Sequence, residues 1–272
     1  MLGDDDFRKV LDHFDLPWAG YRKVRKGVRK RLWRDMRDLG CPDIDAYLAL
    51  VARRQEVFDR CRQCLLVTIS RFFRDRHLWD ALQSCWLPVL EKRFPEGLRA
   101  WSAGCAGGEE PYSLAMAWLA SGCHAGALGT SLHITATDIK PECLERARLG
   151  IYGAGSLKEV PDELRRRFFT SRPRGRWAVD PQLEELIDWK LHDLLHDPPP
   201  AAEGAIHLLL LRNNLLTYYQ GETLQAALEG VLSTLAPGGL LILGAHERLP
   251  EVSPPFVRDE NCPWIYQRAE GC

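Results

Sequence analysis

The sequence predicts an α/β fold with a mainly parallel sheet, preceded by a helical region. From residue 98 onward, short apolar runs alternate with helical patterns, which is typical of a parallel sheet covered by helices. A glycine-rich turn follows the first of these runs, and such turns bring a ligand close to bare backbone. In the first 70 residues, by contrast, apolar positions recur at helical spacing, which indicates a separate helical region.

The composition is that of an ordinary globular protein. The 272 residues are 46% hydrophobic and 27% charged, with a formal net charge of −1, so a core can form without a disulfide or a metal. The near-zero charge gives no indication of a nucleic-acid partner. The chain opens with an acidic segment rather than a signal peptide, and no apolar run approaches the roughly 18 to 20 residues that cross a bilayer. We therefore expect a cytoplasmic protein without membrane insertion.

The cysteines indicate neither a disulfide framework nor a metal centre. Their number, nine, is odd and their spacing irregular, which suits a reducing cytosol. Cys61 and Cys64 form a Cys-x-x-Cys in a helical-looking segment, but no second ligand pair has zinc-like spacing. We expect no metal.

The helical region, residues 1–70, contains the most basic segment of the chain, residues 21–40. Its apolar stripe at four-residue steps consists of Val24, Val28, Leu32 and Met36. A solvated helix face is the ordinary interpretation of such a segment, but only two acids offset its nine basic residues. The charged face is therefore a candidate docking surface for an acidic partner. The candidate docking residues are Arg25, Arg29, Lys30, Arg34 and Arg37.

The expected strands and helices alternate along the rest of the chain. Strands are predicted at Leu98–Ser102, His133–Thr137, Ile187–Leu191, Ile206–Leu211 and Leu240–Leu243. Helices are predicted at Pro111–Ala120, Pro141–Leu149 and Glu222–Leu235. The stretch 150–186 breaks this alternation and is rich in Arg, Pro and Gly, which indicates an insertion on the sheet.

The turn between the first predicted strand and helix carries the strongest chemical signal. It contains three glycines and is followed by two adjacent carboxylates, Glu109 and Glu110. A pyrophosphate would be repelled by these acids, whereas a ligand with an amino group or a sulfonium would be attracted. S-adenosylmethionine (SAM) has both groups. The alternative is a tight turn whose acids merely favour the helix N-terminus.

Three further polar groups follow predicted strands, at the edge where ligands of such sheets bind. Asp138 ends the second strand and is placed to accept hydrogen bonds from ribose hydroxyls. Asp193 follows the third strand, and Arg212 with Asn213 follows the fourth. Together with the glycine turn, these groups predict one site.

With these motifs in place, the chain resembles the chemotaxis receptor methyltransferases of the CheR type over nearly its whole length. The resemblance is carried by residues 70–74 (Ser-Arg-Phe-Phe-Arg), 101–115 (Trp-Ser-Ala-Gly-Cys-Ala-Gly-Gly-Glu-Glu-Pro-Tyr-Ser-Leu-Ala), 136–139 (Ala-Thr-Asp-Ile), 147–152 (Ala-Arg-Leu-Gly-Ile-Tyr), 211–214 (Leu-Arg-Asn-Asn) and 237–241 (Pro-Gly-Gly-Leu-Leu). The string Gly-Glu-Glu-Pro-Tyr-Ser is the most specific of these.

The resemblance implies both an architecture and an activity. The architecture is a class I SAM-dependent methyltransferase domain with a Rossmann-like sheet over residues 98–272, and a small β-subdomain inserted at about 153–186. An all-helical N-terminal domain over 1–70 precedes it, joined by 71–97, which contributes to the active site. The implied activity is methyl transfer from SAM to glutamates on the cytoplasmic helices of a chemoreceptor, leaving methyl esters and S-adenosylhomocysteine (SAH). A monomer is expected.

The resemblance also implies roles for individual residues. The implied cofactor-binding residues are Thr68, Ser70, Arg74, Gly104, Glu110, Asp138, Asp193, Leu194, Arg212 and Asn213. Among them, Glu110 and Arg74 are expected at the methionine end, Asp138 at the ribose, and Asp193 with Leu194 beside the adenine. The implied catalytic residues are Arg74 and Tyr218.

Three departures from the family pattern leave alternatives open. Thr68-Ile-Ser70 replaces Asn-x-Thr, and Gly244-Ala-His-Glu247 replaces Gly-His-Ser-Glu. Thr217 aligns with the family's tyrosine near the transferred methyl, with Tyr218 immediately after it. One alternative is a methyltransferase for another acceptor. The other is a regulatory protein that binds SAM or SAH with lost or weak catalysis.

Overall fold

The computed structural model describes residues 2–122, 131–252 and 255–270, and within them the chain forms two compact units. One unit comprises the chain up to Thr68 together with Thr217–Thr223; the other comprises Ile69–Leu216 and the chain from Leu224 onward. Each unit has its own cluster of buried apolar side chains.

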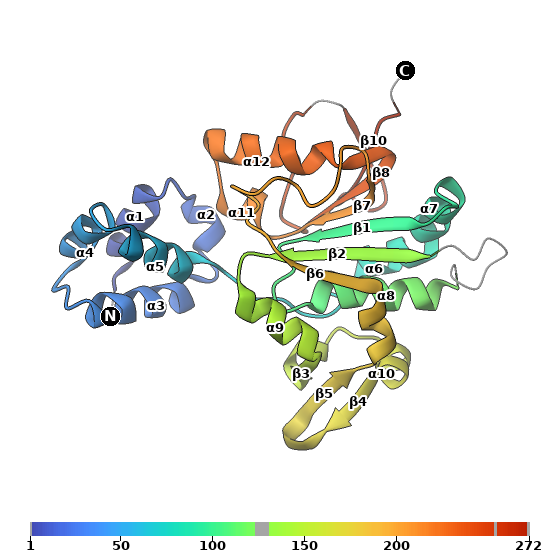
Figure 1. Ribbon diagram of the computed structural model, residues 1–272, viewed down its shortest axis with the longest axis horizontal. Coiled ribbons are helices and arrows are strands. Elements are labelled where there is room, and N and C mark those ends of the chain that lie inside the picture. The colour runs from blue at the N-terminus through green and yellow to red at the C-terminus, as the bar shows by residue number, and fades with distance from the viewer. Residues whose placement is uncertain (1, 123–130, 253–254, 271–272) are drawn as a thin grey trace. The chain divides into compact units, whose positions relative to one another are not determined.

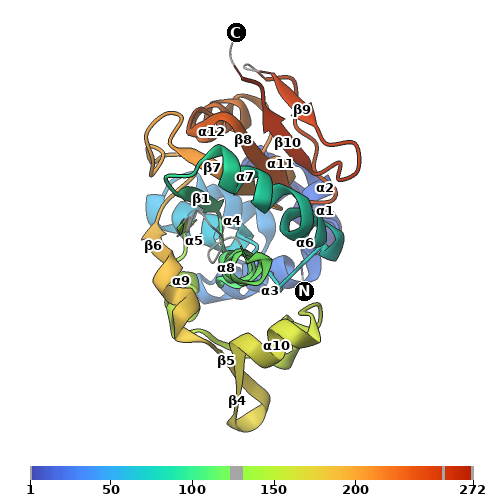
Figure 2. The same cartoon turned by 90° about the vertical axis from the view of Figure 1, so that its right-hand side faces the viewer.

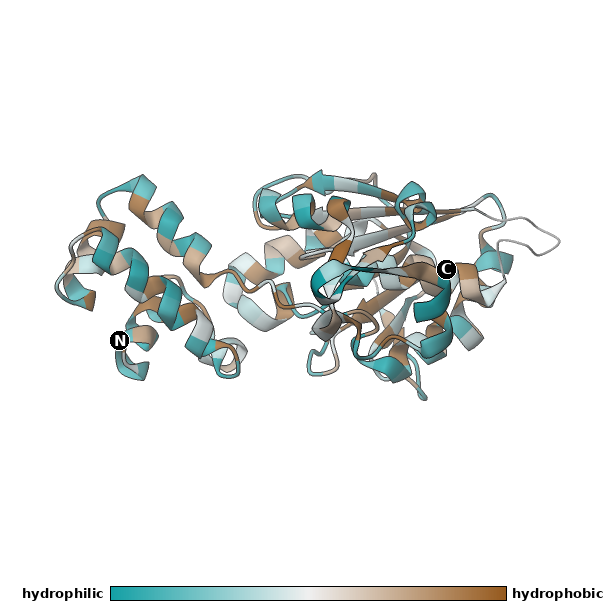
Figure 3. Ribbon diagram, turned by 90° about the horizontal axis from the view of Figure 1, so that it is seen from below, coloured by the Kyte–Doolittle hydropathy of each residue, from teal (hydrophilic) through white to brown (hydrophobic). Residues whose placement is uncertain are grey.

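The first unit is helical. Its helices are α1 (Asp4–His13), α2 (Trp18–Tyr21), α3 (Arg25–Asp38), α4 (Ile44–Val51) and α5 (Gln55–Leu65). Hydrophilic and hydrophobic residues alternate along these helices, as Figure 3 shows, so each has one apolar face to bury. Phe7, Leu32 and Tyr47 lie in the shared core and are fully buried.

The basic segment forms α3, which begins at Arg25, and a turn over residues 22–24 separates it from the short helix α2. Val28, Leu32 and Met36 of the predicted apolar stripe are buried in α3. Asp35 is buried as well: it accepts a hydrogen bond from the Tyr47 hydroxyl at 2.7 Å. One of the two acids of the segment therefore supports the core and does not offset the exposed basic residues.

A seven-stranded sheet forms the centre of the second unit. Its strands, in spatial order, are β6 (Ile187–Leu191), β2 (Leu132–Asp138), β1 (Leu98–Ala103), β7 (Ile206–Leu211), β8 (Leu235–Leu243), β10 (Ile265–Arg268) and β9 (Phe256–Arg258). The first five strands of this order are mutually parallel, and β10 pairs antiparallel with both β8 and β9. This topology confirms the predicted Rossmann-like, mostly parallel sheet.

The helices that lie wholly in the second unit are α6 (Arg76–Ala81), α7 (Leu87–Arg93), α8 (Glu109–Ser121), α9 (Pro141–Leu149) and α10 (Asp162–Phe168). Two further helices, α11 (Leu215–Tyr218) and α12 (Gly221–Ser233), have residues in both units. A π-helical turn at Leu82–Trp86 connects α6 to α7. Helix α8 lies on one side of the large sheet and α12 on the other (Figure 2). Both faces of the parallel strands are therefore covered, and every residue of β7 is buried.

Two predicted boundaries were wrong, for one reason. The predicted helix at Glu222–Leu235 ends at Ser233, and β8 begins at Leu235 rather than at Leu240. The glycines at 238 and 239 lie inside this strand, where they interrupt its apolar pattern in the sequence. A register shift between β7 and β8 accompanies them.

The insertion forms a small antiparallel sheet of its own. Its strands β3 (Ile151–Gly153), β5 (Arg176–Val179) and β4 (Phe169–Arg172) lie in that spatial order, and α10 precedes β4. Figure 1 shows these elements as a projection separate from the large sheet. Short 3-10 turns at Ala154–Leu157, Pro173–Gly175 and Pro181–Leu186 complete the insertion.

Within the described residues, no helix is long and apolar enough to span a membrane. Cys61 is buried, and burial raises the pKa of its thiol to about 12. A thiol with a raised pKa is a poor nucleophile at neutral pH.

The parallel strands bring the predicted site residues to one edge of the sheet. Strand β1 lies between β2 and β7, so the chain reverses its direction of progress across the sheet at β1. Ligands of such sheets bind outside the carboxyl ends of the strands at this point. The glycine turn, Asp138 and Arg212 all follow these strand ends.

Candidate functional site

The glycine turn between β1 and α8 is held close to the ends of β2 and β7. Gly104 has φ +77°, and a Cβ there would lie 2.5 Å from the Asn214 side-chain nitrogen. Gly108 has φ +89°, and a Cβ there would lie 2.7 Å from that of Ala147. The amides of Gly104 and Cys105 donate to the Thr137 carbonyl at 2.9 and 2.8 Å. Only glycine fits these two positions without displacing a neighbour.

Asp138 ties this turn to the end of β2. Its Oδ2 accepts a hydrogen bond from the Ala106 amide at 2.8 Å, and its Oδ1 accepts one from the Lys140 amide at 2.9 Å. The side chain is nearly buried, and burial raises its pKa. The two amides hold the carboxylate in one orientation, and each oxygen keeps a lone pair for a ligand hydroxyl.

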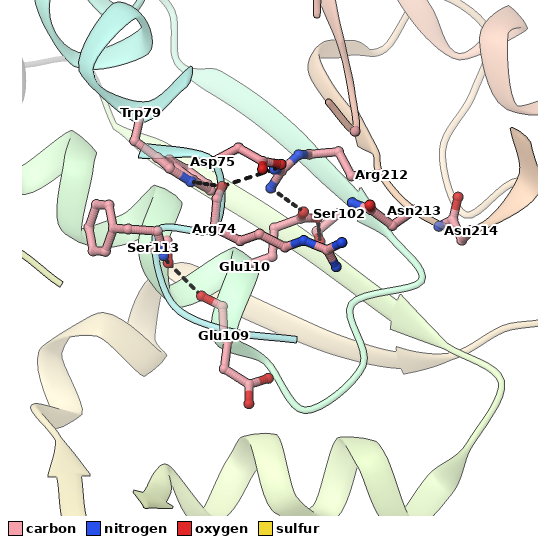
Figure 4. Close-up of polar contacts among 12 residues, drawn as sticks. Arg74, Asp75, Trp79, Ser102, Glu109, Glu110, Ser113, Arg212, Asn213 and Asn214 are labelled. Atoms are coloured by element: carbon pink, nitrogen blue, oxygen red, sulfur yellow. Dashed lines mark hydrogen bonds and ion pairs between the residues drawn. The ribbon is translucent and has the colours of Figure 1, made fainter. Parts of the chain in front are cut away.

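The adjacent acids Glu109 and Glu110 point in different directions (Figure 4). Glu109 is fully buried, and its Oε1 accepts from Arg146 Nη2 at 2.5 Å. Burial raises the pKa of Glu109. Glu110 accepts from the Ser102 hydroxyl at 2.7 Å and from Arg212 Nη1 at 3.0 Å. The interpretation of the pair as two acids facing a cation is therefore wrong for Glu109, which supports the fold.

Arg212 is the centre of a polar cluster that joins β7 to α8 and to the segment before α6. Its side chain is only 2% exposed. Besides Glu110, it contacts Asp75, with Nη2 and Oδ2 2.7 Å apart, and donates from Nη2 to the Arg74 carbonyl at 3.0 Å. Its Nε is buried and has no hydrogen-bond partner among the described atoms. A single buried cation thus lies between two carboxylates (Figure 4).

Arg74 lies in a strained loop of the second unit. The residues on either side, Phe73 and Asp75, have φ +52° and +65°, a region that non-glycine residues rarely adopt. The Phe73 amide donates to the Ser113 hydroxyl at 2.9 Å, and the Arg74 carbonyl accepts from Trp79 Nε1 at 2.9 Å. Such strain is concentrated at functional sites, where the surrounding structure holds it in place.

The Arg74 side chain is half-buried and extends toward Glu110 (Figure 4). Within the described part of the chain its guanidinium makes no hydrogen bond or ion pair; only the backbone carbonyl of this residue is engaged. The five donors of this group are therefore available to an anionic ligand.

Asn213 is also held in an unusual conformation, with φ +57°. Its amide donates to Glu247 Oε2 at 2.7 Å, and the Gly244 amide donates to the same oxygen at 2.8 Å. Glu247 thereby joins the ends of β7 and β8. Asn214 bonds the Ala103 carbonyl and so joins β7 to β1.

The other predicted cofactor residues lie farther along the chain. Asp193 follows β6, and its two oxygens contact the Leu195 amide at 3.0 Å and His196 Nδ1 at 2.8 Å. Leu194 is half-buried in the same turn. Ser70 belongs to the second unit, at the start of the segment that leads to Arg74. The contacts of Asp193 with Leu195 and His196 stabilise the turn that contains it. Its contact with the adenine stays a prediction.

Thr68 and Tyr218 belong to the first unit. The ring of Tyr218 packs against that of Tyr21, with 5.0 Å between centroids. The carbonyl of Thr217 lies 2.1 Å from where a Cβ on Gly20 would be, so this unit needs glycine at position 20.

The predicted docking face on α3 divides into two parts. Arg29 donates to Asp4 at 2.5 Å and to the Leu2 carbonyl, and Arg25 also lies within 3.4 Å of Asp4. These two arginines have intramolecular partners, so the predicted docking face is corrected to exclude them. Lys30, Arg34 and Arg37 are exposed; we call these three residues the basic face.

Sequence reasoning missed several residues of the site. Asp75, Ser102, Arg146 and Glu247 are all hydrogen-bonded to predicted site elements. Asp75 adjoins the Phe-Phe-Arg motif and Ser102 lies inside the glycine-turn motif, so their positions were a usable signal. Glu247 ends the Gly244-Ala-His-Glu247 stretch that aligns with the family's Gly-His-Ser-Glu, so it too had a signal. Arg146 gave none beyond its charge, because a lone charged residue is usually solvated.

The cluster has the right charges for the methionine end of SAM. The carboxylate of Glu110 and the guanidinium of Arg74, which has no partner among the described residues, extend toward one another at the strand ends. An α-amino acid carries one ammonium and one carboxylate, which complement these two groups. No group of three or more His, Cys, Asp or Glu side chains suited to a metal occurs in the described residues.

Comparison with known proteins adds independent information. Residues 68–261 match the family described as CheR methyltransferase, SAM binding domain. The "Chemotaxis protein methyltransferase" of Listeria monocytogenes is 34% identical over 194 residues, which cover 71% of this chain and 70% of that protein. An uncharacterised 104.1 kDa protein of Rhodobacter capsulatus is 33% identical over 231 residues, covering 84% of this chain but only 24% of its own length.

A solved structure is also similar: the N-methyltransferase NodS from Bradyrhizobium japonicum in complex with SAH. It is 18% identical, covers 64% of this chain and 62% of its own, and has a TM-score of 0.34.

Proposed function

The chain belongs to the CheR family of SAM-dependent methyltransferases, and we propose that it methylates glutamate side chains of a chemoreceptor-like protein. The products of this reaction are glutamate methyl esters and SAH. The observation that carries the proposal is the family match over residues 68–261, because that range includes Arg74, Glu110 and Arg212, which surround one site.

When bound, SAM supplies an electrophilic methyl group on a sulfonium. In the proposal, Arg74 binds the methionine carboxylate, since its guanidinium has donors to spare. Glu110 binds the methionine ammonium, and Asp138 accepts hydrogen bonds from the ribose hydroxyls. The amides that hold Asp138 and the strained loop around Arg74 support these roles, because both fix the binding groups before a ligand arrives.

A glutamate acceptor suits this site because it needs little from the protein. Its carboxylate is already ionised near neutral pH, so no general base is required. The protein then contributes by aligning the acceptor with the methyl group and by partly desolvating it. The buried Arg212 cluster, with its fixed charges, provides such a preorganised environment.

The exposed positive charges of the basic face favour a partner protein with an acidic surface. Chemoreceptor helices that present glutamates for methylation are acidic there, and Lys30, Arg34 and Arg37 are exposed on α3. A catalytic role for Tyr218 and an adenine contact for Asp193 and Leu194 complete the proposal. The proposed reaction places the protein in the cytoplasm, where SAM and the receptor's signalling helices are found.

The proposal is tested with SAM carrying a radiolabelled methyl group and with membranes that contain chemoreceptors. We expect label on a receptor-sized protein, released as methanol by mild base, because esters hydrolyse where methylamines do not. Glu110→Gln is the binding-deficient control. Base-stable label would instead identify a different acceptor. SAH binding without transfer to any membrane protein would identify a regulatory protein.

A further inference from the structure

Asp75 is assigned no cofactor contact in the proposed function, yet among the described residues it makes the shortest contact of Arg212. Its Oδ2 lies 2.7 Å from Arg212 Nη2, whereas Glu110 Oε2 lies 3.0 Å from Arg212 Nη1. Asp75 holds this position at φ +65°, and its side chain does not cap the helix that follows. Its carboxylate is therefore directed to Arg212 and not to its own helix.

The charges of the cluster explain what this contact can do. If Arg212 had Glu110 as its one anionic neighbour, the two charges would cancel, and Glu110 would attract a ligand ammonium weakly. With Asp75 present, one buried cation is shared by two carboxylates, so the trio has a net charge of −1. Charge interactions are strong at this depth, because the Arg212 side chain is only 2% exposed.

Arg212, which contacts Asp75, also contacts the backbone of Arg74, the second residue proposed to bind the methionine end of the cofactor. Arg212 Nη2 donates to the Arg74 carbonyl as well as to Asp75, and Trp79 Nε1 donates to that carbonyl too. The backbone of Arg74 is thereby fixed between two left-handed residues. One residue, Asp75, thus bears both on the charge around Glu110 and on the loop that presents Arg74.

We propose that Asp75 is a positioning residue that neutralises Arg212 and so leaves Glu110 with a net negative charge for the cofactor's ammonium. This inference rests on the proposed contact between Glu110 and SAM. It assigns Asp75 a role at the amino-acid end of the cofactor and none at the adenosine end.

Asp75→Asn tests the charge alone. Asparagine has the size of aspartate, tolerates a left-handed backbone and keeps a side-chain oxygen for Arg212. Asp80→Asn is the matched control, because Asp80 is an exposed acid on α6, five residues away. Thermal unfolding of each variant shows whether the fold is retained.

The readout is calorimetric binding of two ligands without any acceptor protein: SAH, and 5′-methylthioadenosine, which lacks the amino acid. We expect Asp75→Asn to weaken SAH binding about tenfold, as loss of one nearby charge in a buried site should. Methylthioadenosine binding should change less than about twofold, and Asp80→Asn should change neither affinity.

Two results would overturn the inference: unchanged SAH affinity in Asp75→Asn, or equal weakening of both ligands. Equal weakening would show that Asp75 supports the fold of the whole site. Glu110→Gln separates this inference from the proposed function. If Glu110→Gln loses SAH affinity while Asp75→Asn does not, the role of Asp75 is wrong; if neither variant loses affinity, the contact between Glu110 and SAM is wrong as well.

Discussion

The Ala106 amide donates a hydrogen bond to Asp138 Oδ2 at 2.8 Å, although the two residues are 32 positions apart in the chain. This bond joins the turn after β1 to the end of β2, the two strands whose carboxyl ends form the first half of the site. Asp138 is thus both a ligand-binding candidate and a support of the glycine turn.

Asp138→Ala should weaken SAH binding by about 1 to 3 kcal/mol, because a charged acceptor of the ribose hydroxyls is lost. Calorimetry measures the affinity directly. Asp188→Ala, at an exposed acid on β6, is the control and should bind SAH like the wild type. If Asp138→Ala kept its affinity, the ribose contact would be wrong.

Arg74→Ala should reduce methyl transfer far more than it reduces stability. Its guanidinium has no protein partner among the described residues, so its removal leaves no buried group unpaired. The loss of a charge-assisted contact predicts a fall in kcat/KM of about tenfold to a hundredfold. Arg71→Ala, three residues earlier with its exposed ion pair to Glu159, should have little effect. Arg74 would be a packing residue if its variant unfolded readily but kept normal activity per folded molecule.

The elements with a clear hydrophobic pattern or a start signal could be predicted from the sequence. Strands β6 and β7 and helix α9 have the predicted bounds: β7 is buried throughout and mostly apolar, β6 alternates apolar and polar residues, and Pro141 marks a helix start. Strands β9 and β10 were not predicted. They contain three and four residues and are largely exposed or half-buried, so their pattern is too short to recognise.

The site could be predicted as a set of residues but not as a network. Arg212 and Glu110 were named, but the contact between Arg212 and Asp75 joins residues 137 positions apart. Likewise, nothing in the sequence of α3 shows that Arg29 is held by Asp4, 25 positions earlier. Such pairings depend on the packing of whole elements, which local patterns do not specify.

Glu109 should make the protein less stable as the pH rises. Burial raises its pKa above the ordinary 4.5 despite the ion pair with Arg146. A carboxyl whose pKa is raised on folding contributes stability below about pH 4.5, and this contribution is lost as the pH rises through the folded pKa. The thermal midpoint of Glu109→Gln relative to wild type should therefore rise between pH 4 and pH 8. Glu145→Gln, at an exposed position on α9, should show a constant difference. If the difference in thermal midpoint between Glu109→Gln and wild type were also independent of pH, burial of Glu109 would not oppose its ionisation.

His207 should have the opposite pH dependence. Its ring stacks on Phe94, with 4.0 Å between centroids, and its Nδ1 accepts from the Arg99 amide at 3.2 Å. Burial lowers the pKa of His207 from 6.5 to about 4. A base whose pKa is lowered on folding contributes stability above pH 6.5, and this is lost as the pH falls through about 4. Denaturant unfolding of His207→Gln should therefore vary less than wild type between pH 7 and pH 4. The control His133→Gln, at an exposed position on β2, should keep the wild-type pH dependence of stability. If His207→Gln also kept it, the His207 ring would not be the cause of that dependence.

The basic face can be tested apart from cofactor binding. Attraction between exposed charges mainly raises the rate of encounter and weakens with salt over a Debye length of about 8 to 10 Å. The double reversal Arg34→Glu and Arg37→Glu should therefore raise the KM for receptor about tenfold at low salt, while SAH affinity stays unchanged. Arg37 contacts Trp33, with 4.9 Å from its guanidinium to the ring centroid, but both side chains are exposed, so little stability is lost.

A matched control makes the same change in net charge at another place on the surface of the same unit. Arg53→Glu with Arg54→Glu reverses two exposed arginines between α4 and α5 of the same unit. If charge on α3 attracts the receptor, this control should raise the KM much less than the reversal on the basic face, and 0.5 M salt should remove the difference. Equal effects of the two double reversals would show that net charge alone matters. Wild-type KM in both would show that α3 presents a solvated surface, since exposed charges without a partner contribute little.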